Sequence, residues 1–382
     1  MKSIQDDDVS RPQQNSNLNL LNLLALSRPN GATDPRDKVY ALLAIVQDDI
    51  AKSIKPDYSI ENTVAKGYIE VAEKYIKHGR GPKLLHHAGG NHLVADLPSW
   101  VPDWSLQTRS VFRKSLYKCS GYSQPHISLG PDPGKIQIRG AIVDSIANVG
   151  FPCRYYTHEF SQDKLLRMLE DQSDSLPAVN TDHHMRQVVY ATGKMFCENL
   201  CSSSRYAEPM SLVLGRTLAA DCTRSGKRSD QAFLESWAAY QEFNENSLQM
   251  PELRKEIELG SDEDRLTGKA WPYEAAMQEV QKGRRICATA AGYFGIATCD
   301  TEKEDLVAVF EGFSMPFVLR RKGQEFMLIG ECYIHGIMDV ELMCADVDQL
   351  DGSQTGEDKN GDRFGIRKPE GEFAVLEGLL LV

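Results

Sequence analysis

The chain has 382 residues, 41% of them hydrophobic and 25% charged, which is enough for one large or two ordinary domains with their own cores. Its formal net charge of -11 argues against nucleic acid or an anionic membrane as a partner. The acidic, amide-rich start lacks the basic and apolar parts of a secretory signal, and the run LNLLNLLAL is too short to span a bilayer. Nine cysteines without CxxC pairs are typical of reduced thiols, so we expect a cytoplasmic protein.

The first part of the chain predicts helices followed by a sheet. SIENTVAKGYIEVAEKYIKHG (59–79) repeats apolar residues at helical spacing, with Ser59 as the N-cap and Gly79 as the stop. DPRDKVYALLAIV (34–46) predicts a shorter helix that begins at its aspartate and proline. Strands are expected between residues 97 and 150, because prolines hold LPSWVPDWS extended and GKIQIRGAIVDSIANVG alternates apolar and polar residues.

The rest of the chain returns to helices and then to strands. Residues 181–200 and 230–243 have helical patterns, whereas the highly charged residues 250–269 are typical of a mobile linker. DLVAVFEG, PFVLRR and EFMLIGECYIHGIM predict strands, and Gly323 between the last two suits a hairpin turn. The polar, glycine-rich residues 346–372 predict a loop or disorder.

These patterns indicate an α+β protein, with helical N-terminal and middle regions, antiparallel strands and a small β-sheet or barrel toward the C-terminus. We divide the chain into five regions: a flexible leader (1–31), helices followed by strands (32–150), a mostly helical variable region (151–282), a compact antiparallel sheet (283–345) and a polar, loop-rich tail (346–382).

GECYIHGIM (330–338) gathers more reactive side chains than any neighbouring stretch. In a regular strand, Glu331, Tyr333 and His335 share one face, while Cys332 and His335 point to opposite faces and cannot act as nucleophile and base. Glu331 and His335 would lie about 13 Å apart at about 3.3 Å per residue, too far for a direct hydrogen bond. The three residues therefore form a polar row, which either satisfies itself or lines a groove.

Other clusters do not fit a metal centre. His86, His87 and His92 sit beside glycines, with no cysteine or acidic pattern at zinc-site spacing. One helix carrying Cys197, Cys201, His183 and His184 cannot surround a metal tetrahedrally. The stretch DGSQTGEDKNGD has the residue spacing of an EF-hand calcium loop, but it lacks the final glutamate and the flanking helices. Its matching residues are Asp351, Ser353, Thr355, Gly356 and Asp362. We expect no metal and no cofactor.

Several segments, taken in order and spacing, resemble the fungal heterokaryon incompatibility (HET) domain protein family. They are ATDPRDKVYALLAI, IKPDYS, LPSWVPDWS, YKCSG, IQIRGAIVDSIANVG, GRRICATAAGYFGIA and LIGECYIHGIMDVE, covering about Ala32 to Gly150 and Gly283 to Glu341. In that family such segments follow the name-giving domain, which resembles the Toll/interleukin receptor fold and is tied to allorecognition and cell death after fusion of unlike hyphae. The motifs of that domain are missing here, so the resemblance implies a C-terminal region without the HET domain.

The matched segments also contain residues that we expect to have structural roles. Arg36 and Asp37 open a helix, where the carboxylate complements the helix dipole and the guanidinium can reach a neighbouring segment. Trp100 and Trp104 are large apolar anchors, expected to pin LPSWVPDWS against the helices rather than to stack on a ligand.

Two carboxylates and two glycines complete the set of structural candidates. Asp144 and Glu331 would cap backbone amides or pair with an arginine, for which Arg139, Arg284 and Arg320 are equal candidates. Gly330 and Gly336 permit close approach of the backbone on the core face.

We therefore expect a non-enzymatic accessory or regulatory region of a HET-type protein, which acts as a scaffold or docks a protein partner, with a HET domain in cis or in trans as one such partner. Glu331, Tyr333 and His335 are the residues expected to line its polar groove. The alternatives are a hydrolase-like enzyme that uses His335 with a carboxylate from another strand, and a decaying fragment without function.

Overall fold

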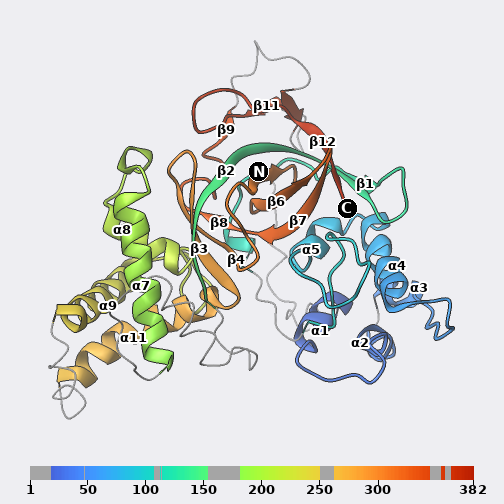
Figure 1. Cartoon of the computed structure of the whole chain (residues 1–382), viewed down its shortest axis with the longest axis horizontal. Helices are drawn as coiled ribbons and strands as arrows, with labels where there is room; N and C mark the ends of the chain where they lie inside the picture. The colour runs from blue at the N-terminus through green and yellow to red at the C-terminus, as the bar shows by residue number, and fades with distance from the viewer. Residues whose placement is uncertain are drawn as a thin grey trace, which may run out of the picture.

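The computed structural model describes residues 19–46, 48–106, 112, 114–153, 181–249, 262–344, 354–357 and 363–382. A large sheet lies at the centre, with the N-terminal helices on one side and a second group of helices on the other (Figure 1). This arrangement confirms the expected α+β class. Among the helices of the described part, none combines the length and the apolar character that crossing a bilayer requires.

Among the residues that the structure describes, five helices form the N-terminal side: α1 (Leu20–Leu26), α2 (Asp37–Tyr40), α3 (Asp49–Ser53), α4 (Val64–Lys77) and α5 (Gly81–Leu85). Helix α4 starts later than predicted, because Thr63 rather than Ser59 is its N-cap and accepts a hydrogen bond from Lys66 N. The carbonyl of Ser59 instead accepts from Arg36 Nη1 at 3.0 Å and from Asn62 N at 3.3 Å, which holds the preceding residues in a turn. The predicted end is confirmed, since Gly79 has φ +68° just after the helix.

The central sheet contains β1 (Ile127–Leu129), β2 (Ile136–Cys153), β3 (Arg284–Thr289), β4 (Phe294–Thr298), β5 (Leu306–Phe310), β6 (Phe317–Lys322), β7 (Glu325–Glu331), β8 (Tyr333–Ile334) and β12 (Glu377–Leu381). Its strands follow the order β12-β7-β6-β5-β2-β3-β4-β8, with β1 paired to β2. The predicted hairpin is confirmed, because Lys322 pairs with Glu325 across Gly323, whose φ is +66°. By contrast, LPSWVPDWS forms turns rather than strand.

Strand β2 is the longest strand of the sheet, and its two halves pair with different strands. Its first half pairs with β12 and β5, so that Gly140 lies opposite both Glu377 and Phe310, and its second half pairs with β3. Strand β12 also meets β7 at the single pair Leu381–Phe326, which leaves the barrel-like arrangement incompletely closed. The sheet expected within residues 283–345 thus also includes two strands from before that region, β1 and β2, and one from after it, β12.

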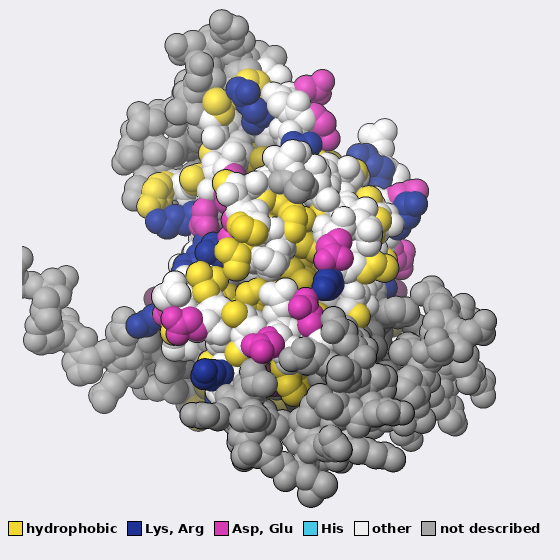
Figure 2. All heavy atoms as spheres, turned by 90° about the vertical axis from the view of Figure 1, so that its left-hand side faces the viewer, with side chains coloured by type: hydrophobic (Ala, Val, Ile, Leu, Met, Phe, Trp, Pro, Cys, Tyr) yellow, Lys and Arg dark blue, Asp and Glu magenta, His cyan; other side chains and the backbone are white. Residues whose placement is uncertain are grey.

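Helices on the other side are α7 (Thr181–Asn199), α8 (Met210–Leu218), α9 (Gln231–Gln249) and α11 (Asp262–Gln281), which we call the helical unit. The charged stretch predicted as a linker is partly helix, since α11 begins at Asp262, while residues 250–261 lie outside the described part. Aromatic side chains pack its core: the ring centroids of Trp237 and Tyr273 are 4.9 Å apart. Figure 2 shows hydrophobic side chains gathered on the outer face of this side, among charges of both signs.

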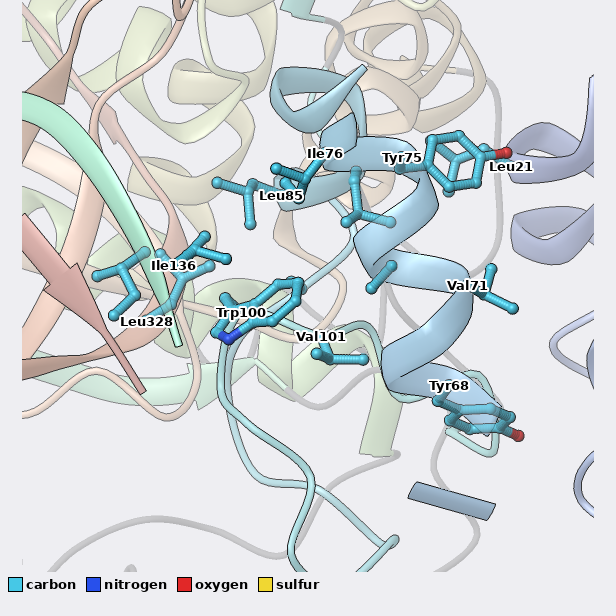
Figure 3. Packing of buried hydrophobic residues seen from close by; sticks show 14 of the residues in the cluster. Leu21, Tyr68, Val71, Tyr75, Ile76, Leu85, Trp100, Val101, Ile136 and Leu328 are labelled. Atoms are coloured by element: carbon cyan, nitrogen blue, oxygen red, sulfur yellow. The ribbon is translucent and has the colours of Figure 1, made fainter. Parts of the chain in front are cut away.

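A hydrophobic core joins the N-terminal helices to the sheet. Figure 3 shows Trp100 between Ile136 and Leu328 of the strands and the side chains of α4 and α5. Burying one side chain as large as that of Trp100 stabilises the folded state by about 2–3 kcal/mol, so these contacts hold the helices firmly on the sheet. A separate three-stranded sheet contains β9 (Met343–Cys344), β10 (Thr355–Glu357) and β11 (Arg363–Ile366) in the order β10-β11-β9.

Candidate functional site

The strand expected to carry the polar row is broken in the middle. Strand β7 ends at Glu331 and pairs with β6, whereas β8 begins at Tyr333 and pairs with β4. Gly330, with φ +145°, and a register shift between Val318 and Leu319 of β6 turn the chain at this point. The regular alternation used for the prediction therefore does not hold, and the three polar residues lie in two different surroundings.

Glu331 belongs to a buried charged cluster. Its Oε2 lies 2.7 Å from Nδ1 of His86, and its Oε1 lies 3.3 Å from Nη2 of Arg284 and accepts from the backbone N–H of Phe112. Arg284 also stacks over the ring of Phe112, with its guanidinium carbon 3.6 Å from the ring centroid. All three charged side chains are buried, so this cluster joins the end of α5, strand β3 and strand β7 inside the molecule.

The cluster keeps the Glu331 carboxylate ionised. Burial by itself raises the pKa of Glu331, but the hydrogen bond from His86 and the charges of His86 and Arg284 outweigh burial. The pKa of Glu331 therefore lies below its ordinary value, and the carboxylate carries its charge in the folded protein.

Tyr333 and His335 are joined to each other instead. The Tyr333 hydroxyl lies 2.7 Å from Nδ1 of His335, and Nε2 of the same ring lies 2.6 Å from Oε1 of Glu208. This hydrogen bond from His335 lowers the pKa of Glu208 below its ordinary value, against the effect of burial. The relay connects the turn after β8 to the loop that precedes α8.

An ionic network continues from this relay along the edge of the helical unit. Glu208 lies 3.4 Å from Arg216, and Asp221 pairs with Arg228, which also pairs with Asp339. We call the residues of this network and relay the polar seam: Glu208, Arg216, Asp221, Arg228, Tyr333, His335 and Asp339. The seam joins the helical unit to the sheet.

Backbone strain is concentrated beside the polar seam. Ala220, Asp221 and Val340 are non-glycine residues with φ of 49°, 47° and 48°, and Val340 follows Asp339 directly. Left-handed conformations are costly for such residues and persist only where the surroundings impose them, often at functional sites. The Tyr117 hydroxyl donates to the carbonyl of Ala220 and helps to hold this conformation.

The other predicted structural residues have defined contacts. Arg36 hydrogen-bonds the carbonyls of Ser59 and Asn62, so its guanidinium does reach a neighbouring segment. Asp37 accepts from the hydroxyl of Tyr58. Both tryptophans of LPSWVPDWS are buried: Trp100 donates from Nε1 to the carbonyl of Gly134 at 2.7 Å, and Trp104 packs edge-on against Tyr68 of α4 at 4.9 Å.

The remaining candidates lie near the backbone. Asp144 caps amides, because its Oδ1 accepts from Ser145 N at 2.8 Å and from Ala291 N at 3.3 Å. Gly336, with φ +92°, faces the ring of Tyr293, which a Cβ would approach within 3.1 Å. Of the three arginines considered for the two carboxylates, Arg284 is the one that pairs with Glu331.

Metal-ligating residues do not converge in the described ranges. No group of three or more histidine, cysteine, aspartate or glutamate side chains is arranged there to hold a metal ion. His86 is paired with Glu331, and Nδ1 of His92 donates to the carbonyl of Leu97 at 3.0 Å. The side chains of His183 and His184, and most of the loop resembling an EF-hand (Asp351, Ser353 and Asp362), lie outside the described residues.

Sequence reasoning missed most partners of these residues. Glu208 lies 127 positions from His335 and His86 lies 245 from Glu331, so no local spacing relates them. Only the isolated polar residues of GECYIHGIM drew attention to the region. Finding their partners from sequence would have required many related sequences, in which paired positions vary together.

Comparisons with known proteins agree with this architecture. Residues 133–349, more than half of the chain, match the Het-6 β-barrel domain family, and the chain belongs to that family. The match extends from the turn before β2 to beyond β9 and includes the helical unit. The resemblance to the heterokaryon incompatibility proteins is therefore confirmed.

One curated relative has a name that bears on function. The chain is 26% identical over 352 residues to heterokaryon incompatibility protein 6, OR allele, of Neurospora crassa, with 85% of this chain covered. It spans about half the length of that relative, 51%. No solved structure matches the chain.

Proposed function

We propose that this chain is a non-catalytic accessory or regulatory region of a heterokaryon incompatibility protein and acts in the cytoplasm as a scaffold that docks a protein partner. Its family and the name of its relative in Neurospora crassa support a role in incompatibility. A HET domain, in the same chain or in another, is the partner that the family context favours.

One observation supports the scaffold role: the charged and hydrogen-bonding side chains of the candidate site bind one another and so join separate parts of the chain. The buried cluster around Glu331 connects α5, β3 and β7, and the polar seam connects the helical unit to the sheet. Charged groups that bind one another in this way fix the relative positions of elements instead of converging on a substrate.

The polar seam is the docking surface in this proposal. The side chain of His335 is 12% exposed, while those of Arg228 and Asp339 are 32% and 44% exposed. Exposed charges at a rim steer and orient a partner. Tyr333 holds the His335 ring by the hydrogen bond to Nδ1, and Glu331 anchors the end of β7, after which the chain continues into β8.

The role in incompatibility is tested in the fungus that carries the gene. Two otherwise isogenic strains that differ only at this locus are paired, and the fraction of fused cells that take up a vital dye is measured. Asp339→Asn removes the most exposed charge of the seam, while Arg228 keeps its ion pair with Asp221, so this variant should reduce the response. Lys52→Ala, an exposed change in α3, serves as the matched control. An unchanged response after deletion of the gene would contradict the role in incompatibility.

A hydrolase remains the second candidate, because a specific geometry favours it. His335 lies between a hydroxyl and a carboxylate, at 2.7 Å from Tyr333 and 2.6 Å from Glu208, as in a nucleophile–histidine–acid triad. However, Tyr333 is only 1% exposed, and burial raises its pKa well above the ordinary value, so it is a poor nucleophile that substrate does not reach. Hydrolysis of p-nitrophenyl acetate that is lost in both Tyr333→Phe and His335→Ala would support the enzyme instead of the scaffold.

A further inference from the structure

An asparagine followed by a glycine lies in the loop that joins α1 to α2. Asn30 and Gly31 are both exposed, and in Figure 1 this loop runs along the outer edge of the N-terminal helices. Asn30 N donates to the carbonyl of Ser27 at 2.9 Å, in the turn that follows α1. Among the described residues, no atom beyond the chain neighbours of Gly31 lies within 4 Å of the place that a Cβ would take there. Solvent therefore reaches this peptide bond, and the Asn30 side chain has room to move beside it.

This dipeptide contains the atoms for an intramolecular reaction. The backbone nitrogen of Gly31 follows the residue that carries the side-chain amide, so its attack on Cγ of Asn30 closes a five-membered succinimide ring. The N–H proton goes to a base in the solvent, the N–Cγ bond forms, and the NH₂ group takes up a proton and leaves as ammonia. Because glycine has no Cβ, its nitrogen approaches Cγ with little steric obstruction.

Lys38 of α2 contacts the peptide group that reacts. Its Nζ donates to the carbonyl of Asn30 and, at 2.9 Å, to the carbonyl of Arg28. The Asn30 carbonyl and the Gly31 N–H belong to one peptide group, in which resonance spreads charge from the nitrogen to the oxygen. When Gly31 loses its proton, negative charge therefore develops on an oxygen that the ammonium already contacts. The ammonium stabilises this charge and so favours ring closure.

The surroundings of Lys38 strengthen it as a donor. Burial and, to a smaller extent, the charge of Arg28 lower the pKa of Lys38 below its ordinary value. The ammonium is therefore more acidic than that of an exposed lysine and forms a stronger hydrogen bond to a developing anion. Both carbonyls that it contacts are neutral, so these contacts leave its positive charge uncancelled.

The same contact selects the product of the second step. Water opens a succinimide at either of its two carbonyls: attack at the former Cγ of Asn30 gives aspartate, and attack at the former backbone carbonyl gives isoaspartate. In the second route, the charge of the tetrahedral intermediate lies on the oxygen beside Lys38, and the product carries a free carboxylate at that place. Lys38 therefore favours isoaspartate and forms an ion pair with it.

We propose that Asn30 is a site of spontaneous deamidation, at which Lys38 promotes formation of the succinimide and directs its hydrolysis to isoaspartate. The change replaces a neutral amide by a carboxylate and lengthens the main chain between α1 and α2. It also creates the group that an S-adenosylmethionine-dependent isoaspartyl methyltransferase esterifies. This modification is independent of the polar seam and of the role in incompatibility.

The test follows the purified full chain during storage at neutral pH. Samples taken at intervals are digested, and mass spectrometry detects the replacement of the amide NH₂ by OH in the peptide that contains Asn30. Methylation of the same peptide by a purified isoaspartyl methyltransferase, with labelled S-adenosylmethionine, measures isoaspartate. We expect isoaspartate to accumulate at Asn30, while Asn199, an exposed asparagine followed by Leu200, stays unchanged in the same samples. Gly31→Ala should react several-fold more slowly, because its Cβ obstructs the attack.

Substitutions of Lys38 separate its role from the reactivity of any asparagine–glycine pair. Lys38→Met should react about tenfold more slowly and give a smaller share of isoaspartate, because a hydrogen bond from a charged group to the developing anion is lost. Lys38→Arg keeps the charge and should keep most of both effects. Lys52→Met removes the same charge from an exposed position of α3 and should change neither.

Each variant is compared at a circular dichroism that matches that of the unsubstituted protein. The proposal is overturned if Asn30 reacts no faster than Asn199, or if aspartate is its main product. It is also overturned if Lys38→Met reacts at the rate of the unsubstituted protein, because Asn30 would then deamidate without help from the ammonium.

Discussion

Replacing Glu331 by glutamine should strongly destabilise the protein. Glu331 and Arg284 are each 2% exposed at the side chain, and Glu331 also accepts from His86 and from the backbone of Phe112. A glutamine can keep one acceptor oxygen, but it leaves the guanidinium buried without an opposite charge and turns an amide NH₂ toward a donor. Breaking a buried pair in this way costs about 3–5 kcal/mol, a large part of a typical folding free energy of about 5–15 kcal/mol.

The free energy of unfolding of Glu331→Gln is measured by urea denaturation with tryptophan fluorescence. Glu325→Gln is the matched control, because Glu325 lies on the same strand and pairs with Lys135 at 2.6 Å near the surface. The control should lose no more than about 1 kcal/mol. A loss below about 1 kcal/mol in Glu331→Gln itself would refute the interpretation that the cluster holds α5 and the two strands together.

The pH dependence of stability supplies a second measure of the same cluster. The pKa of Glu331 is lowered in the folded protein, so its contribution is fully present above the unfolded carboxyl pKa of about 4.3 and is lost as the pH falls through the lower, folded value. Between about pH 5 and pH 3, the unsubstituted protein should therefore lose more stability than Glu331→Gln. Parallel curves for the two proteins would contradict an ionised Glu331.

Substitutions at two sites and one labelling experiment test packing in other parts of the fold. Gly89→Ala should cost about 1–3 kcal/mol more than Gly79→Ala in urea denaturation, since both glycines have positive φ but only at Gly89 would a Cβ meet a backbone oxygen, that of Ile329, at 2.7 Å. Trp104→Ala should cost about 3–5 kcal/mol by the same assay, and Trp104→Phe clearly less; equal losses would argue against ring packing on α4. In native alkylation followed by mass spectrometry, Cys332 should stay unmodified because it is buried, with its pKa raised well above the ordinary value by that burial; its labelling at the rate of the half-buried Cys344 would disprove this.

Local features of the sequence were sufficient where short-range physics decides the outcome. The helix that Gly79 ends and the hairpin that Gly323 turns were both predicted, because glycine reaches a left-handed conformation without steric cost. The predicted start of α4 was wrong by about one turn, because Ser59 and Thr63 are both good N-capping residues. The carbonyl of Ser59 accepts a hydrogen bond from Arg36, which is distant in sequence, and the helix begins after Thr63.

The candidate site was predicted in part. GECYIHGIM was recognised as unusual, but the polar row assumed one regular strand, which the turn at Gly330 and the separate pairing of β8 do not provide. Arg284 was one of three arginines considered for Glu331, and His86 was considered only as a metal ligand. Glu208 carried no local signal at all.

By itself, the sequence determined the α+β class, the HET-type family and the main helices and strands, because periodicity, capping residues and turn glycines act over a few positions. Only the tertiary structure decided that β2 and β12 share a sheet with strands from β3 to β8, and that Glu331 and His335 find their partners in opposite parts of the molecule. These arrangements depend on contacts between residues more than a hundred positions apart. Such contacts form when folding brings buried polar groups together and each of them must find a partner.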